Sequence, residues 1–200
     1  MESGHSLDII SNESLIDSFP IVLANGKRKR QAKVARECCA EGYCSSKDMH
    51  YYGAKLHVIG FRRVGTLPMP EYVHVTDASV HDLTAVRNTL ETTRNRTFWG
   101  DRAYIDQSLN SIMEQNSSVM ITPVKKRKGQ SEWETQFSSA ANTLFSSAVS
   151  RVRQPIESFF NWLEQKVSLQ KASTVRSSAG LVTFIFARLA FCLLLLLGIC

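Results

Sequence analysis

The feature that most constrains the fold is an apolar stretch at residues 15–23 that contains a carboxylate. Six of its nine residues are large and apolar, which is typical of a buried β-strand, although Pro20 removes one backbone donor. A carboxylate buried in such a strand is costly unless a proton, a cation or a metal ion neutralises it. Asp17 therefore needs a partner from another part of the chain.

The middle of the chain alternates between strand-like and helix-like patterns. Apolar and polar residues alternate from residue 51 and again at residues 72–75, which predicts an antiparallel hairpin. Helical spacing of apolar residues follows to about residue 93. Ser79, followed three positions later by Asp82, resembles a capping box at the start of this helix.

Two further strands and one helix complete this part of the chain. Residues 97–99 and 119–122 are short apolar segments bounded by Gly100 and Pro123, and residues 103–115 have helical spacing. The order of strands, helix, strand, helix and strand predicts an α/β fold. We expect a mixed sheet that is led by an antiparallel hairpin and flanked by helices.

The remaining segments are assigned by composition. Residues 1–12 are a polar leader, and residues 26–47 are polar, basic and cysteine-bearing and are expected to be irregular. Residues 123–150 are basic and rich in serine, and we expect them to form an insertion. Residues 13–200 are thus expected to form one domain.

Two helices are expected after this insertion. Pro155 suits the first turn of a helix with an apolar stripe. The terminal helix, at residues 174–200, is apolar enough to raise a membrane span as an alternative to a buried core helix. Arg188 lies inside this segment and shortens the uninterrupted apolar run, which favours the buried helix and no membrane contact.

The charge of the chain favours a polyanionic partner. The 200 residues include 24 Lys and Arg against 18 Asp and Glu, a formal net charge of +6. This surplus suits nucleic acid, with solvated basic loops as the alternative. The five cysteines are an odd number without zinc-ribbon spacing, and the N-terminus has no apolar signal segment. We expect reduced thiols and a cytoplasmic protein.

Three carboxylates occupy places that metal chemistry would explain. Asp17 lies inside the apolar strand, Asp101 follows Gly100 at the end of a strand, and Glu157 lies beside the apolar stripe of a helix. Together they can hold Mg²⁺ or Mn²⁺, which prefer oxygen ligands. Each acid also has a separate structural explanation. Asp17 would suit a turn, Asp101 would cap a helix, and Glu157 would interact favourably with the dipole in the first turn of a helix. Spacing alone does not decide between these interpretations.

Five motifs resemble, in the same order, those of the DDE transposases of bacterial insertion sequences. They are I-D-S-F-P at residues 16–20, Y-G-A-K-L-H at residues 52–57, S-V-H-D at residues 79–82, G-D-R-A-Y at residues 100–104 and R-Q-P-I-E-S-F-F at residues 153–160. The resemblance covers nearly the whole chain and implies an RNase H-like catalytic domain. It also implies that His81 and Asp82 lie near the site.

By position, the resemblance makes Asp17, Asp101 and Glu157 a catalytic, metal-binding triad. Two Mg²⁺ or Mn²⁺ ions would bracket a phosphodiester, which water attacks in hydrolysis and a 3′-hydroxyl attacks in strand transfer. Arg153, one helical turn before Glu157, is expected to clamp a DNA phosphate or to pair with that glutamate. A basic run between the second and third acids is expected to bind the DNA backbone or to be a solvated loop. This run consists of Lys125, Lys126, Arg127 and Lys128.

The expected partners follow from the same resemblance. They are double-stranded DNA, as element ends and as target, and a second protomer on that DNA, with the protein associated with the nucleoid. Ser150 and Glu164 stand where many relatives have tyrosine and lysine, so the resemblance leaves the acid triad intact but does not extend to the details of contact with the element ends. Two alternatives remain open at this point. One is a nuclease of the same fold that only hydrolyses DNA, and the other is a truncated, inactive DNA-binding remnant.

Overall fold

The structure is a computed structural model that describes residues 12–124 and 132–199. The strands are β1 (Glu13–Asn25), β2 (Ala40–Cys44), β3 (Met49–Phe61), β4 (Met69–Asp77), β5 (Thr97–Trp99) and β6 (Val119–Ile121). The α-helices are α1 (Asp82–Thr92), α2 (Gln107–Gln115), α3 (Glu132–Val167) and α4 (Ser178–Leu196). Short 3-10 helices are η1 (Gly26–Gln31), η2 (Ser45–Lys47) and η3 (Arg102–Tyr104). The basic run at residues 125–128 and the leader up to residue 11 lie outside the described residues.

One six-stranded mixed sheet organises the chain. Its order is β2-β3-β1-β5-β6, and β4 also pairs with β3. The strand β3 is long enough to pair with β2 along its first residues and with β4 along its remainder, both antiparallel. The strand β1 runs antiparallel to β3 and parallel to β5, which runs parallel to β6. The predicted α/β class, with a mixed sheet and a leading hairpin, is confirmed.

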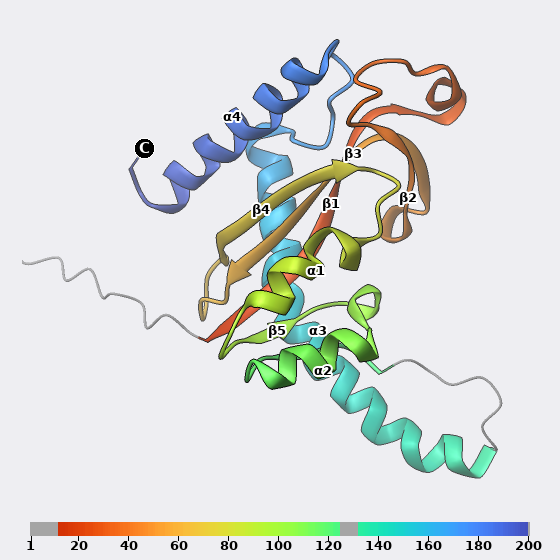
Figure 1. Ribbon diagram of the computed structural model, residues 1–200, viewed down its shortest axis with the longest axis vertical. Coiled ribbons are helices and arrows are strands. Elements are labelled where there is room, and N and C mark those ends of the chain that lie inside the picture. Colours follow the sequence, from red (N-terminus) through yellow and green to blue (C-terminus); the bar gives the residue numbers. More distant parts are fainter. Residues whose placement is uncertain (1–11, 125–131, 200) are drawn as a thin grey trace, which may run out of the picture.

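The two faces of the sheet carry separate hydrophobic cores because successive side chains of a strand point to opposite faces. Leu15 and Phe19 of β1 pack with α3 and α4 on one face, whereas Ile16 packs with α1 and α2 on the other. Figure 1 shows the helices on both sides of the sheet. This alternation puts Asp17 on the face that α3 covers.

Two segments differ from the sequence prediction. Residues 40–44, expected to be irregular, form the edge strand β2, whose side chains are half-buried or exposed and therefore lack the apolar signal of a core strand. Residues 132–150, assigned to an insertion, form the first half of α3, which extends away from the sheet in Figure 1. Among the described side chains of residues 139–150, only Val149 is buried, and Leu144 and Phe145 are exposed, so no apolar stripe is buried there. Pro155 lies inside α3 and not in a first turn.

The starts of two helices also differ from prediction. The N-cap of α1 is His81, whose Nδ1 accepts the backbone N–H of Leu83 at 3.3 Å, so the proposed Ser79 capping box is wrong. Ser79 instead bonds to Asp77 in the preceding turn. The expected helix at residues 103–115 is divided into η3 and α2, because the side chain of Asp106 caps α2 through the N–H of Leu109.

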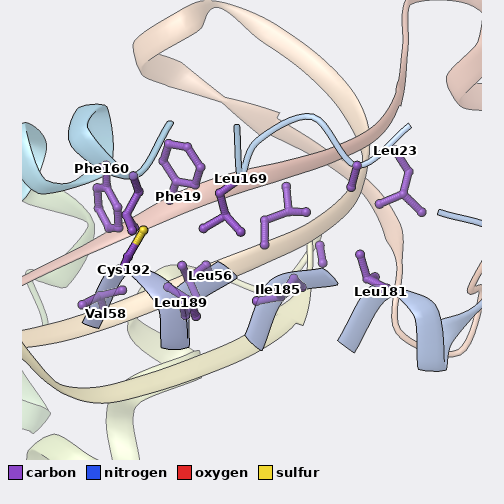
Figure 2. Packing of buried hydrophobic residues seen from close by; sticks show 14 of the residues in the cluster. Phe19, Leu23, Leu56, Val58, Phe160, Leu169, Leu181, Ile185, Leu189 and Cys192 are labelled. Carbon is purple, nitrogen blue, oxygen red and sulfur yellow. The ribbon is translucent and has the colours of Figure 1, made fainter. Parts of the chain in front are cut away.

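The terminal helix α4 packs along the sheet with one face (Figure 2). Leu181, Ile185, Leu189 and Cys192 recur at helical spacing and are buried in the same core as the β1 and β3 side chains. The opposite face of α4 is apolar and exposed. By length and composition alone this helix could cross a membrane, and 22% of its apolar window is buried. One face of α4 is therefore part of the core, while most of the helix surface is exposed, so the prediction of a buried core helix stays a prediction.

Truncating two leucines of α4 tests this packing. Leu189 is 5% exposed and Leu194 is 40% exposed. We expect Leu189→Ala to lower the free energy of unfolding by about 2–4 kcal/mol, because it leaves a cavity against the sheet. Leu194→Ala makes the same chemical change and should cost less than about 1 kcal/mol. Urea unfolding in detergent-free buffer measures both. Equal effects would show that α4 does not pack as described.

Candidate functional site

A cavity of about 420 Å³ brings together the residues that the sequence motifs single out. It lies on the α3 face of β1 and is also lined by β3, η2 and the segments that begin α1 and η3. Its charged lining residues are Asp17, Asp82, Asp101, Glu157, Lys47, Lys55 and Arg153. All three predicted acids and Arg153 therefore meet at one place, although they come from distant parts of the sequence.

Asp17 is held in the middle of β1 and is not a turn residue. Its Oδ1 accepts the backbone N–H of Ser18 at 2.8 Å, and its Oδ2 accepts a hydrogen bond from Arg153 at 3.1 Å. Burial raises the pKa of this carboxyl to about 7, against the lowering effects of Arg153 and of the Ser18 hydrogen bond. The nearby carboxylates of Asp101 and Asp82 add to the increase in pKa. The ionised form of Asp17 is thus incompletely compensated by the protein.

Arg153 lies between the first and the third predicted acids. Its guanidinium is 3.1 Å from Asp17 and 3.8 Å from Glu157, and its side chain is only 9% exposed. Arg153 and Glu157 are four residues apart on α3, so both point to the same side of the helix. The predicted intrahelical ion pair is therefore present, together with a second pair that joins α3 to the sheet.

Asp101 combines two of the roles considered from the sequence. Its Oδ1 accepts the N–H of Ala103 at 2.8 Å and caps η3, while the residue also lines the cavity. A side chain on Gly100 would lie 2.8 Å from the ring of Tyr104, so glycine permits the close packing that directs the chain from β5 into the cavity. Among the described residues, Asp101 has no ion-pair partner.

Glu157 is the most accessible of the three acids. Its side chain is 56% exposed, and it lies well inside α3, so its expected place in a first helical turn is wrong. The dipole of a helix acts mainly within its first and last turns. The position of Glu157 is therefore explained by the cavity that it faces and not by the helix dipole.

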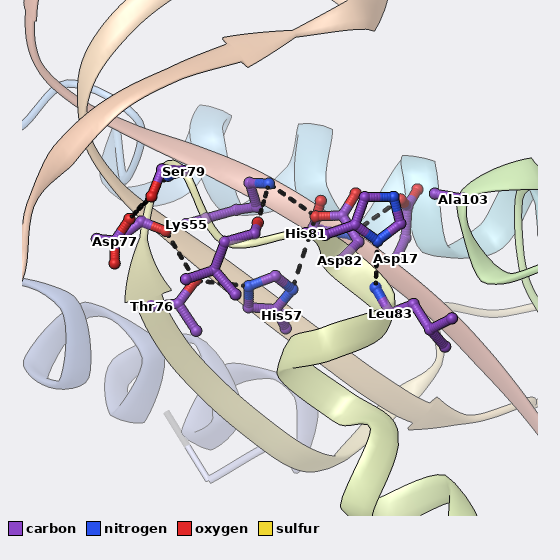
Figure 3. Close-up of polar contacts among 12 residues, drawn as sticks. Asp17, Lys55, His57, Thr76, Asp77, Ser79, His81, Asp82, Leu83 and Ala103 are labelled. Carbon is purple, nitrogen blue, oxygen red and sulfur yellow. Dashed lines mark hydrogen bonds and ion pairs between the residues drawn. The ribbon is translucent and has the colours of Figure 1, made fainter. Parts of the chain in front are cut away.

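Lys55 is a charged residue of the cavity to which the sequence assigned no role. Lys55 donates to Asp82 Oδ1 and to the carbonyl of Val80, both at 2.9 Å (Figure 3). This places Asp82 beside the predicted acids, as the motif resemblance implies. The imidazole of His57 is fully buried and lies 3.9 Å from Asp82, and burial lowers its pKa to about 4. The sequence gives no signal for this role, because Lys55 occupies a polar position in an alternating strand, where a lysine is typical of a solvent-facing side chain.

The donor set fits a hard divalent cation, although a complete ligand cage is not formed. Within residues 12–124 and 132–199, no group of three or more His, Cys, Asp or Glu side chains is arranged to hold a metal ion. The guanidinium of Arg153 lies between the carboxylates of Asp17 and Glu157 and forms an ion pair with each of them. The oxygen donors, from separate elements around one cavity, are nevertheless the type that Mg²⁺ and Mn²⁺ prefer.

The fold and the cavity define a class of α/β protein in which a mixed sheet and a long helix bring carboxylates to one site. A family model described as "Transposase DDE domain" matches residues 9–175, which include all three predicted acids and Arg153. The chain therefore belongs to the transposase DDE domain family. Comparison with curated proteins and with solved structures gives no significant match.

The raised pKa of Asp17 gives a testable dependence of stability on pH. The folded protein binds the proton of the Asp17 carboxyl more tightly than the unfolded chain does, because this carboxyl has a pKa near 3.8 when the chain is unfolded. The contribution of Asp17 to stability is therefore present below pH 4 and is lost as the pH rises towards about 7. We expect wild type to lose stability relative to Asp17→Asn across this range, by at most about 1.4 kcal/mol per pH unit. Urea unfolding of both proteins in EDTA measures the difference, and a constant difference would contradict the assignment.

Proposed function

We propose that this protein is a DNA transposase that cuts and joins phosphodiester bonds at the ends of an insertion sequence. The observation that carries the proposal is the convergence of Asp17, Asp101 and Glu157 on one cavity in a chain of the transposase DDE domain family. The mixed sheet, with β1 antiparallel to β3 and parallel to β5, supports an RNase H-like fold. In this proposal the three acids are the catalytic, metal-binding triad.

The proposed cofactor is a pair of Mg²⁺ or Mn²⁺ ions held by Asp17, Asp101 and Glu157. When bound, such ions activate the attacking water or 3′-hydroxyl and stabilise the leaving oxygen. The protein contributes carboxylates that differ in exposure and in their contacts. Asp17 is held by the β1 backbone and Asp101 by its cap to η3, whereas the Glu157 side chain is more than half exposed and is held only by its 3.8 Å ion pair with Arg153.

The proposed substrate is double-stranded DNA, both as element ends and as target. The guanidinium of Arg153 reaches the cavity and has the fork geometry that binds a phosphate through two hydrogen bonds. Lys125, Lys126, Arg127 and Lys128 follow β6 in sequence and would add contacts with the DNA backbone that do not depend on base sequence. A second protomer on the DNA and a location at the nucleoid belong to the same proposal.

The central test is nicking and strand transfer on DNA with the element ends, in the presence of Mg²⁺ or Mn²⁺. We expect Asp101→Asn to reduce both reactions at least about a hundredfold, because it removes a charged metal ligand. Asp106→Asn is the matched control, since it makes the same change at a helix cap, where asparagine is equally suitable. The control should retain activity and fold.

The products of this assay separate the candidate functions. Joined DNA identifies a transposase, and metal-dependent nicks without joined products identify a hydrolysis-only nuclease. DNA that is bound but never cut identifies an inactive remnant and contradicts the proposal. Activity that survives Asp101→Asn would remove this residue from the triad.

The basic run is tested by the salt dependence of DNA binding. Replacing Lys125, Lys126, Arg127 and Lys128 with glutamine should weaken binding to unrelated DNA sequences to a similar degree. It should also reduce the slope of log affinity against log salt by about 0.9 for each phosphate contact that is lost. Fluorescence anisotropy at several salt concentrations measures this slope. An unchanged slope would show that these side chains are solvated and do not contact DNA.

A further inference from the structure

Arg153 differs from the two lysines of the cavity in the side chains with which it forms ion pairs. Its guanidinium ion-pairs with Asp17 and Glu157, two of the three proposed metal ligands. Lys55 is engaged by Asp82 and by a backbone carbonyl, and Lys47 donates to Gln170. Within the described part of the chain, Arg153 is thus the one cavity cation that pairs with the proposed triad.

The present position of Arg153 leaves part of its guanidinium unsatisfied. Its Nε is buried, and no hydrogen-bond acceptor for it is found among the described residues. The side chain as a whole is more than nine-tenths buried and faces a cavity large enough to admit a phosphate group. A buried donor without an acceptor carries a desolvation penalty. An incoming phosphate, with several acceptor oxygens, could satisfy donors that Asp17 and Glu157 leave unused.

We propose that Arg153 is an internal cation that occupies the acid site in the free protein, and that a DNA phosphate draws it away and releases Asp17 and Glu157 for divalent ions. This inference rests on the proposed function and adds a regulation to it. The guanidinium and the metal ions compete for the same carboxylate oxygens. The site therefore has a low affinity for divalent ions before DNA binds and a high affinity afterwards.

The proposal predicts a coupling between DNA and metal that can be measured without any cleavage. A ligand that binds only the fraction of molecules with a vacated site shows an apparent affinity reduced by that fraction. Removing Arg153 should therefore tighten Mn²⁺ binding to the free protein. Because coupling between two ligands is reciprocal, bound Mn²⁺ should also tighten DNA binding in wild type.

Isothermal titration of Mn²⁺ into wild type, Arg153→Gln and Lys47→Gln tests this. Without DNA, Arg153→Gln should bind Mn²⁺ about tenfold more tightly than wild type. Lys47→Gln also removes one positive charge from the cavity and should change the affinity less than about twofold, because Lys47 does not pair with the triad. Arg153→Lys, which keeps the charge, should stay within about threefold of wild type. With saturating uncleavable DNA, the affinity of wild type should rise towards that of Arg153→Gln.

The outcomes separate the inference from the proposed function. If Arg153→Gln binds Mn²⁺ no more tightly than wild type, or if Lys47→Gln gains as much, the internal-cation role is overturned while the metal site stands. If no protein binds Mn²⁺ with or without DNA, the proposed function fails as well. Should Arg153→Gln unfold in EDTA, we expect Mn²⁺ to restore its circular dichroism spectrum, since a ligand of the folded state stabilises it. Failure of Mn²⁺ to do so overturns the inference.

Discussion

The ion pair between Asp17 and Arg153 is the interaction on which the rest of the site depends. It joins residues 136 positions apart and fixes the long helix α3 to the central strand β1. A buried pair of this kind is weak evidence for stability, because desolvation can exceed the Coulombic attraction. The pKa of Asp17 is raised in the same sense, because burial outweighs the lowering effect of Arg153. The pair is therefore better explained by what it positions, since it brings Glu157 to the same cavity.

The sheet supplies the remaining geometry. Parallel pairing of β1 with β5 sets the chain after β5 beside β1, and the close packing at Gly100 directs Asp101 towards Asp17. On the other side of β1, Lys55 of β3 holds the Asp82 carboxylate at the start of α1. Acids from four separate segments thus share one cavity, and their mutual repulsion favours a cation among them.

The elements that could be predicted from the sequence are those with a clear pattern of buried apolar side chains. The strand β1, the β3–β4 hairpin and the short strands β5 and β6 were all expected close to their observed positions. The edge strand β2 and residues 139–150 of α3 could not be predicted, because their described side chains bury no apolar face. The motif resemblance located the acids. It could not show that Arg153 lies between two of them, since that depends on the packing of α3 against β1.

Anomalous diffraction from crystals of the protein bound to DNA and soaked in Mn²⁺ would test the proposed metal site most directly. We expect Mn²⁺ in the cavity, with ligands from Asp17, Asp101 and Glu157, and Arg153 turned onto a DNA phosphate. Mn²⁺ bound through other side chains, or a DNA complex without Mn²⁺ in this cavity, would show that the three acids are not the metal site.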